Sequence, residues 1–444
     1  MPQNMIASKN ASPIFTAKIE SLAHDGRGIA RLDGKTVFIS NSLPGETVAF
    51  QRIAKHRRFD EGVAVEILTA AAERVVARCQ HFGVCGGCSL QHLSPPAQIA
   101  FKQQVLLEQF QHIGKVTPAR VMPPLQANPW AYRRKGRLGV KYVTKKQALF
   151  VGFREQRSNF LAELTRCEVL HAHVGMRLMA LRELIYQLQT FQSIAQIEVA
   201  AGDDHTALVI RHLQPLPDAD LQLLRHFAQQ HDFYLYLQPG GLDSITPCYP
   251  DHLTLNGLRY ALTQEEVDFQ FAPFDFVQIN AEMNQLMVAQ AMQWLAVTAQ
   301  DNVLDLFCGL GNFTLPLAKR AAQVTGIEGE ATLVTRARAN AERQGFHTIN
   351  YHIANLADPN LQQTWMQQPY DKVLLDPPRT GALEIIRALS FKQVQRLVYV
   401  SCNPATLARD AAELIKKDFH LTQVGVMDMF PHTAHVEAMA VFER

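Results

Sequence analysis

The pattern of apolar and polar positions divides the chain into three parts, of which the first is a series of short strands. Between residues 14 and 68, runs rich in β-branched and aromatic residues alternate with the turn sequences HDGRG, DGK and LPG. Short runs bounded by Gly, Asp and Pro predict strands, and five of them in this arrangement predict a small OB-like β-barrel. We expect this barrel to occupy residues 1–70.

The second part, residues 71–275, mixes helical and strand-like periodicity. After two prolines, residues 97–113 have apolar positions at helical spacing. Residues 169–262 then alternate helical segments with the strand-like segments AQIEVA, TALVIRHL and FYLYLQ. This mixture predicts a central α+β domain.

The third part, residues 276–444, alternates strand and helix regularly. A helix is expected near residues 281–296, and it is followed by the strands NVLDLF, QVTGIE, INYHIA and KVLLD. A regular β/α alternation predicts an α/β fold with a doubly wound parallel sheet of the Rossmann type. Ligands bind such sheets at the carboxyl ends of the strands, and the candidate chemistry of this chain lies there.

Length and composition agree with a globular protein of several domains. The 444 residues exceed what one core usually supports, and 47% apolar with 19% charged residues is ordinary for a soluble chain. Residues 1–13 lack the apolar core of a signal peptide, and no run approaches the roughly 18 apolar residues of a membrane span. We therefore expect a cytoplasmic protein without membrane contact. The net charge of +2 says little, because the basic residues are clustered.

The first basic cluster lies in a turn of the predicted barrel. It contains Arg52, Lys55, His56, Arg57 and Arg58. On a small barrel such a cluster is a plausible phosphate contact. A solvated charged loop is an equally good interpretation.

The second cluster, residues 133–146, holds seven Lys or Arg residues and no acidic residue. On an alternating strand, Arg137 and Lys141 would lie on the face opposite the apolar residues. Trp130 and Tyr132 precede them, and cations beside aromatic rings suit single-stranded RNA, whose phosphates meet cations and whose bases stack. A solvated hairpin is the alternative, and the aromatic neighbours favour RNA contact.

Seven cysteines in a cytoplasmic protein argue for metal ligation or catalysis rather than disulfide bonds. Three of them, Cys79, Cys85 and Cys88, lie close together among glycines. Cys167 is the best candidate for a fourth ligand. Four thiolates suit either Zn²⁺ or an iron–sulfur cluster, and the spacing leaves both open.

A glycine-rich turn, residues 307–312, follows the strand that ends at Asp305. Glu328 closes the next strand, where an acid can accept hydrogen bonds from ribose hydroxyls. A nicotinamide dinucleotide is the competing ligand, but Thr314 stands where its fingerprint needs a third glycine. We therefore favour S-adenosylmethionine, which has no phosphates, with Asn355 near its adenine.

The fourth strand ends in Asp376-Pro377-Pro378-Arg379. The prolines stiffen this loop and hold Asp376 at the cleft, while Arg379 could meet a phosphate. The loop resembles that of amino-methylating enzymes, in which an aromatic residue after the prolines stacks on the base. Arg379 in that position argues against adenine-N6 chemistry.

Cys402 ends the fifth strand, directly before Asn403, a good helix N-cap, and Pro404, which suits a first helical turn. A thiol facing a helix N-terminus is expected to favour the thiolate. A small buried core residue is the alternative for a lone cysteine. The final strand brings Glu437 back toward the same edge of the sheet.

Together DLFCGLGN (305–312), DPPR (376–379), SCNP (401–404) and HVE (435–437) resemble the RNA uridine-C5 methyltransferase family. HDGRGIARLDGKTVFISNSLPGE resembles the RNA-binding TRAM module. The resemblance implies a Rossmann-like class I methyltransferase sheet, an OB-like TRAM barrel and a central α+β iron–sulfur domain. It also implies that residues 97–124 pack on the catalytic domain.

The resemblance further implies roles for individual residues. The four cysteines would hold a 4Fe-4S cluster, Cys402 would be the nucleophile, and Glu437 the base. The cofactor, S-adenosyl-L-methionine, would be bound by Gln278, Phe307, Asn312, Glu328, Asn355 and Asp376. The barrel and the cysteines together resemble bacterial members that methylate 23S ribosomal RNA.

We therefore expect methylation of uracil C5 in 23S rRNA without an obligate protein partner. The Cys402 thiolate would add to C6, which makes C5 nucleophilic, and Glu437 would later remove the C5 proton. The target base would be flipped out of the RNA. A methyltransferase acting on tRNA or on cytosine C5 is one alternative, and an RNA-binding assembly factor with a vestigial catalytic half is another.

Overall fold

The computed structural model describes residues 13–444. Residues 1–12, which make up most of the N-terminal segment judged above to lack a signal peptide, lie outside the described part. The chain divides into two compact units, the first Met1–Gln98 with His432–Ala434 and the second Ile99–Pro431 with His435–Arg444. Within residues 13–444 there is no helix that is long and apolar enough to cross a membrane.

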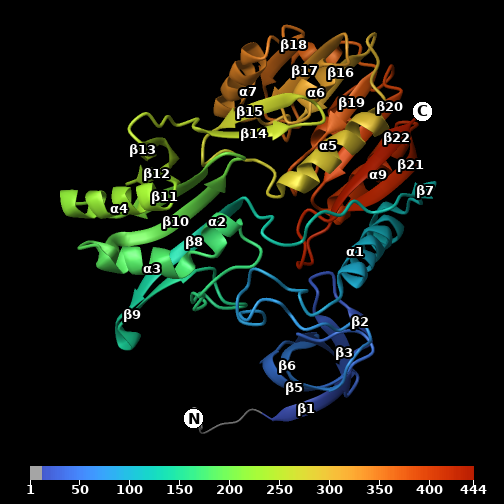
Figure 1. Cartoon of the computed structure of the whole chain (residues 1–444). Helices are drawn as coiled ribbons and strands as arrows, with labels where there is room; N and C mark the ends of the chain where they lie inside the picture. The colour runs from blue at the N-terminus through green and yellow to red at the C-terminus, as the bar shows by residue number, and fades with distance from the viewer. Residues whose placement is uncertain (1–12) are drawn as a thin grey trace. The chain divides into compact units, whose positions relative to one another are not determined.

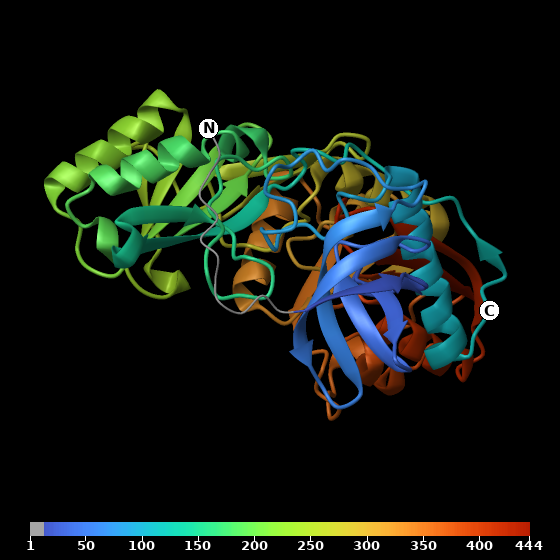
Figure 2. The same ribbon diagram turned by 90° about the horizontal axis from the view of Figure 1, so that it is seen from below.

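The first unit is built on a curled six-stranded sheet (Figures 1 and 2). Its strands are β1 (Ile14–Lys18), β2 (Ser21–Leu22), β3 (Gly28–Leu32), β4 (Lys35–Ser40), β5 (Thr47–Lys55) and β6 (Phe59–Thr69), in the order β1-β5-β6-β4-β3-β2. The first predicted strand is in fact two, because the chain changes partner within it. Ile19 N donates to Glu46 O, whereas Glu20 N donates to Ile29 O. This switch joins the two edges of the sheet, so six strands rather than the predicted five form the barrel.

The second unit begins with α1 (Pro95–Gln109), most of which belongs to it, and a π-helical turn, η1 (Phe110–Gly114). A six-stranded sheet follows, in the order β13-β12-β11-β10-β8-β9. Its strands are β8 (Lys135–Val143), β9 (Ala148–Gly152), β10 (Ile194–Ala201), β11 (Thr206–His212), β12 (Phe233–Gln238) and β13 (Thr246–Tyr249). Its helices are α2 (Ala172–Gly175), α3 (Leu178–Gln187) and α4 (Asp218–Gln230), as the mixed periodicity predicts.

The larger sheet of this unit has eight strands in the order β18-β17-β16-β19-β20-β22-β21-β7. They are β7 (Arg120–Val121), β16 (Asn302–Leu306), β17 (Gln323–Glu328), β18 (Ile349–Ile353), β19 (Lys372–Leu375), β20 (Arg396–Ser401), β21 (His420–Met427) and β22 (Glu437–Glu443). Strands β16 to β20 pair in parallel, as predicted, whereas β22 is antiparallel to both of its neighbours. A short connection from β21 permits only antiparallel pairing, since a parallel one needs a long crossover.

Helices cover both faces of this sheet (Figure 1). They are α5 (Ala281–Leu295), α6 (Thr314–Ala318), α7 (Ala331–Arg343), α8 (Leu383–Ala388) and α9 (Pro404–Ile415), and a hairpin of β14 (Leu258–Leu262) and β15 (Val267–Phe271) is also present. Single-turn 3-10 helices are η2 (Thr144–Lys146), η3 (Phe191–Ser193), η4 (Leu242–Ser244) and η5 (Thr364–Gln367). Along β20, Val398 and Val400 face one core, while Leu397 and Tyr399 face the other.

Helix α1 packs on the face of the eight-stranded sheet to which Leu397 and Tyr399 point. Val105, Leu106 and Phe110 share the core on that face with Leu407 of α9. At the end of the helix Gly114 lies so close to α9 that a Cβ would stand 2.6 Å from the Ala408 carbonyl oxygen. Only glycine fits there, so α1 and α9 are held tightly together.

Candidate active site

The loops after β16, β19 and β20 meet at the carboxyl edge of the eight-stranded sheet. Leu306 pairs in register with Leu375, and Leu375 with Tyr399. The residues that follow these strand ends are therefore neighbours. They include Phe307, Asp376 and Cys402.

Cys402 and Glu437 stand opposite each other at this edge. The last paired residues of β20 and β22 are Ser401 and Ala438, so the next residue on each chain is Cys402 and Glu437 respectively. Glu437 is buried and Cys402 is half-buried. The thiol and the carboxyl group thus share one partly enclosed site.

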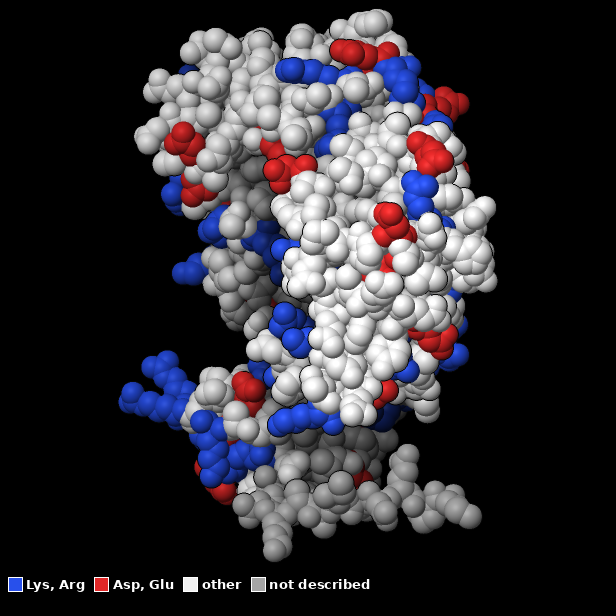
Figure 3. Space-filling model, turned by 90° about the vertical axis from the view of Figure 1, so that its left-hand side faces the viewer, with Lys and Arg blue, Asp and Glu red and all other residues white. Residues whose placement is uncertain are grey.

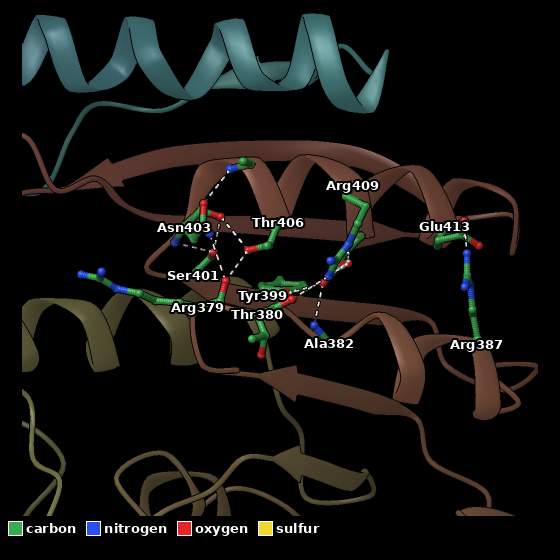
Figure 4. A network of polar contacts seen from close by, with 12 residues as sticks. Arg379, Thr380, Ala382, Arg387, Tyr399, Ser401, Asn403, Thr406, Arg409 and Glu413 are labelled. Atoms are coloured by element: carbon green, nitrogen blue, oxygen red, sulfur yellow. Dashed lines mark hydrogen bonds and ion pairs between the residues drawn. The ribbon is translucent and has the colours of Figure 1, made fainter. Parts of the chain in front are cut away.

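Local hydrogen bonds fix the turn that carries Cys402 (Figure 4). Asn403 Oδ1 accepts from Ala405 N at 3.1 Å, which caps α9, and Asn403 N donates to Ser401 Oγ at 3.1 Å. Pro404 occupies the first turn of the helix. These are the roles that the sequence predicts for Asn403 and Pro404.

The DPPR loop is fastened to the same turn. The Arg379 carbonyl accepts from Asn403 Nδ2 at 3.0 Å and from Thr406 Oγ1 at 3.3 Å (Figure 4). The Arg379 side chain is exposed, and its Nη2 lies 3.3 Å from His435 Nδ1. A cation therefore stands at the mouth of the site.

Burial and crowding of acids shift the pKa values of the site. Burial, reinforced by Asp376, raises the pKa of Glu437 to about 8, although Arg379 and Lys102 oppose the shift. Burial raises the pKa of Asp376 to about 7. Burial, with Glu437 and Asp376, raises the pKa of Cys402 to about 11, and Arg379 opposes this. The expectation of a thiolate favoured by the helix N-terminus is wrong for the protein alone, because burial and acidic neighbours dominate.

The glycine-rich turn leaves space for a ligand. Phe307, Gly309 and Gly311 have φ of 65°, 54° and 93°. A Cβ on Gly309 would meet no atom within 4 Å, so the turn is open on that side. Glu328 Oε2 accepts from Gly309 N at 3.1 Å, which draws the turn against the end of β17. These features fit an adenosyl cofactor.

Asn312 is held by two residues that sequence reasoning missed. Its Oδ1 accepts from Asn284 Nδ2 at 3.0 Å and from Tyr260 Oη at 3.1 Å, while its Nδ2 donates to Asn284 Oδ1 at 2.9 Å. Asn284 lies on α5 and Tyr260 on β14, outside the motif. A polar residue within the apolar face of a helix was the only available signal for Asn284.

Gln278 and Asn355, which are also expected to bind the cofactor, make fewer hydrogen bonds in the structure. Gln278 is half-buried, and Asn355 Oδ1 accepts from Ala357 N at 3.1 Å. Thr314 Oγ1 donates to buried Asp305 Oδ2 at 2.5 Å, which explains a threonine where a dinucleotide site has glycine. Cys308 is buried against Gly326, in agreement with a packing role.

Comparison with known proteins identifies the family to which the chain belongs. The tRNA (Uracil-5-)-methyltransferase family matches residues 257–444, and the TRAM domain matches residues 14–51. The 23S rRNA (uracil(1939)-C(5))-methyltransferase RlmD of Xanthomonas campestris pv. campestris (strain 8004) is 49% identical over 434 residues, 97% of each chain. The RlmD of Methylococcus capsulatus is 50% identical over 435 residues, 98% of each chain. The chain belongs to the RNA uracil-C5 methyltransferase family.

The solved structures agree on the fold. The Pyrococcus abyssi tRNA (uracil-54, C5)-methyltransferase, in complex with S-adenosyl-L-homocysteine, has a TM-score of 0.73 and 23% identity, covering 96% of this chain and 100% of its own. The predicted Rossmann-like methyltransferase fold and the TRAM domain are therefore confirmed. The prediction of an S-adenosylmethionine-dependent enzyme of the RNA uracil-C5 methyltransferase family is also confirmed.

An RNA methyltransferase needs exposed cations to contact phosphates. The structure shows that some residues of the two predicted clusters are not exposed for RNA contact. Tyr132 is only 7% exposed and donates from Oη to the Pro431 carbonyl at 3.1 Å, so its ring is not open for base stacking. Arg134 is buried and paired with Asp203. In the barrel Arg52 pairs with Asp60 at 3.1 Å.

Other cations of both clusters do face solvent. Arg137 and Lys141 are exposed on β8, opposite buried Leu138 and Val140, as the alternation predicts. Lys55, His56, Arg57 and Arg58 are exposed at the turn between β5 and β6. Figure 3 shows several groups of Lys and Arg side chains at the surface.

The expected cluster ligands Cys79, Cys85 and Cys88 belong to the first unit, and Cys167 belongs to the second. In the first unit Gly87 N donates to Cys85 Sγ at 3.4 Å, and in the second Leu170 N donates to Cys167 Sγ at 3.4 Å. Over residues 13–444 no group of three or more His, Cys, Asp or Glu side chains is assembled to hold a metal ion. The structure thus does not show the predicted iron–sulfur site.

Proposed function

We propose that the protein methylates C5 of a uridine in 23S ribosomal RNA through a covalent adduct between Cys402 and uracil C6. The observation that carries this is that Cys402, directly after β20, and Glu437, the first residue of β22, lie opposite each other just beyond the last paired residues, Ser401 and Ala438, with an open glycine turn at the same edge of the sheet. Uracil C5 is a weak nucleophile, and a methyltransferase must first raise its electron density.

Cys402 supplies that activation. Addition of its sulfur to C6 turns the ring into an enolate whose C5 can attack an electrophilic methyl group. The thiol must lose its proton for this step, and with a pKa of about 11 it is protonated in the protein alone. Asp376, with a pKa of about 7, is partly ionised at neutral pH and can receive that proton.

Glu437 completes the reaction. After methyl transfer the C5 proton has to leave before the bond between sulfur and C6 can break. The Glu437 carboxylate can accept that proton, a kind of assistance that typically contributes about 10²- to 10⁴-fold. With a separate acceptor for the thiol proton, that proton does not protonate Glu437.

S-adenosylmethionine supplies the electrophilic methyl group when it is bound. We assign its binding to Gln278, Phe307, Asn312, Glu328, Asn355 and Asp376. The open space over Gly309 and the carboxylate of Glu328 support this assignment. Ribose hydroxyls are natural donors to such a carboxylate.

The substrate is inferred from the relatives and from the barrel. Relatives about 50% identical over nearly the whole chain are named for uracil 1939 of 23S rRNA, and the N-terminal barrel matches an RNA-binding type of domain. Exposed Lys55, Arg57 and Arg58 suit phosphate contact.

We also propose that the thiolates of Cys79, Cys85, Cys88 and Cys167 hold a 4Fe-4S cluster. Four thiol donors and backbone N–H groups directed at Cys85 and Cys167 suit such a cluster. Because methyl transfer to uracil needs no electron, its role would be structural or in positioning RNA. The predicted central iron–sulfur domain, residues 71–275, depends on this proposal.

One experiment tests the proposed substrate and product. The protein is incubated with tritiated S-adenosylmethionine and unmodified 23S rRNA, 16S rRNA or tRNA transcripts, and the labelled nucleoside is identified. We expect label in 23S rRNA alone, as 5-methyluridine at one position. Label in tRNA, or as 5-methylcytidine, would contradict the proposal, and no label at all would favour a vestigial catalytic half.

A further inference from the structure

Lys102 is a fully buried cation that no step above uses. It lies on α1, with 0% of its surface exposed. Its Nζ is 2.6 Å from Asp428 Oδ1 and donates to the Phe430 carbonyl at 2.9 Å. A lysine in the interior requires such partners, because an unpaired buried charge is strongly disfavoured.

These contacts fix the segment that leads from β21 toward Glu437. Asp428 N donates to the Leu125 carbonyl at 2.9 Å. The Phe430 ring packs against the His435 ring, with centroids 5.4 Å apart. Lys102 therefore holds the main chain just before the residues that carry the site.

Lys102 also contributes positive charge to the site itself. The groups that act on Glu437 are Asp376, which disfavours its carboxylate, and Arg379 and Lys102, which favour it. Cys402 lies beside the same carboxyl group. Arg379 acts on Glu437 from an exposed position, whereas Lys102 acts from the interior. Burial lowers the pKa of Lys102, and Asp428 and Glu437 oppose that shift by favouring its charged form.

We propose that Lys102 is a positioning residue for Glu437: it fixes the segment before β22 and supplies a buried positive charge that favours the carboxylate form of Glu437, the form that removes the C5 proton. This rests on the proposed role of Glu437 as the base. Through Lys102, α1 would then support proton removal by Glu437 in addition to packing on the sheet.

The test measures proton removal directly. Tritium release from 23S rRNA transcripts containing [5-³H]uridine is followed in single turnovers from pH 6 to 9. Lys102→Met removes the cation, and Lys102→Met with Asp428→Asn removes both charges, so that no unpaired carboxylate is left to destabilise the fold. We expect both variants to move the midpoint of the pH profile upward by about one unit, which makes release about tenfold slower on the acidic side. The rates should converge with wild type at high pH.

Lys115→Met is the matched control, because it removes an exposed lysine just beyond the same helical segment. It should leave the midpoint unchanged. A uniform loss of rate across all pH values in the Lys102 variants, or an unchanged profile, would overturn the inference.

Glu437→Gln separates the two claims. If it releases tritium at the wild-type rate, Glu437 is not the base, and both the proposed step and this inference fail. If it is slow while the Lys102 variants keep the wild-type midpoint, only the role of Lys102 fails.

Discussion

The side chain of Asn403 donates from Nδ2 to the main-chain carbonyl of Arg379 at 3.0 Å. This bond joins the loop after β19, which carries Asp376, to the turn after β20, which carries Cys402. Asn403 also caps α9 through Oδ1. One amide thus stabilises a helix and fixes the spacing between the two loops.

Asn403→Ser should separate the capping of α9 from the joining of the two loops. A serine hydroxyl still caps the helix, so the free energy of unfolding should change by less than about 1 kcal/mol. It is too short to reach the Arg379 carbonyl, and we expect kcat for methyl transfer to fall about tenfold. Thermal unfolding and steady-state kinetics measure the two effects, and an unchanged kcat would show that the loops keep their spacing without this bond.

Cys402 should be required for covalent trapping of RNA containing 5-fluorouridine. We expect Cys402→Ala to form no adduct at any pH, whereas Cys248→Ala, which changes a half-buried cysteine in the other sheet, should trap RNA normally. Because the pKa of Cys402 is about 11, only about one molecule in 10⁴ holds a thiolate at pH 7. Alkylation of Cys402 by iodoacetamide at pH 7 should therefore be slow. Trapping by Cys402→Ala would disprove the nucleophile.

Glu437→Gln should form the adduct and release it slowly, by about 10²- to 10⁴-fold. The pKa of Glu437 is raised to about 8, so the carboxylate becomes scarcer as pH falls below 8. Wild-type release should accordingly rise with pH up to about 8 and then level off. The glutamine variant should lack that dependence, and gel analysis of the trapped RNA over time measures both. Normal turnover by the variant would exclude Glu437.

The cysteine proposal has its own test. Protein purified without oxygen should be brown and contain iron and sulfide, and Cys88→Ser or Cys167→Ser should lose both. Cys248→Ala serves as the control and should keep them. A colourless protein that contains zinc would contradict the 4Fe-4S assignment.

Local patterns explain why much of the catalytic half could be predicted. Asn403 and Pro404 start α9 as expected, since caps depend on neighbours in sequence. The alternation on β8 likewise places Arg137 outward and Leu138 inward.

What could not be predicted depends on contacts between distant segments. The sequence predicts that the Tyr132 ring stacks on RNA bases, but in the fold Tyr132 is buried and its hydroxyl donates to the Pro431 carbonyl. The pKa of Cys402 was predicted to be low from the helix N-terminus alone, but Glu437 and burial act in the opposite direction. Lys102 lies within the helix predicted for residues 97–113, and no pattern in the sequence links it to Asp428, which only the fold brings to it.

Asn284 provides a last prediction, on cofactor affinity. Asn284 and Asn312 exchange hydrogen bonds of 3.0 and 2.9 Å, and Tyr260 adds another to Asn312. Asn284→Ala removes two of these three bonds, so the Asn312 amide can rotate. A bond of this type is worth about 1 kcal/mol, so Kd for S-adenosylhomocysteine should rise roughly five- to tenfold by calorimetry. Tyr260→Phe should have a smaller effect, because it removes one bond, and kcat at saturating cofactor should change little in either variant. An unchanged Kd in Asn284→Ala would mean that Asn312 does not bind the cofactor or needs no support to do so.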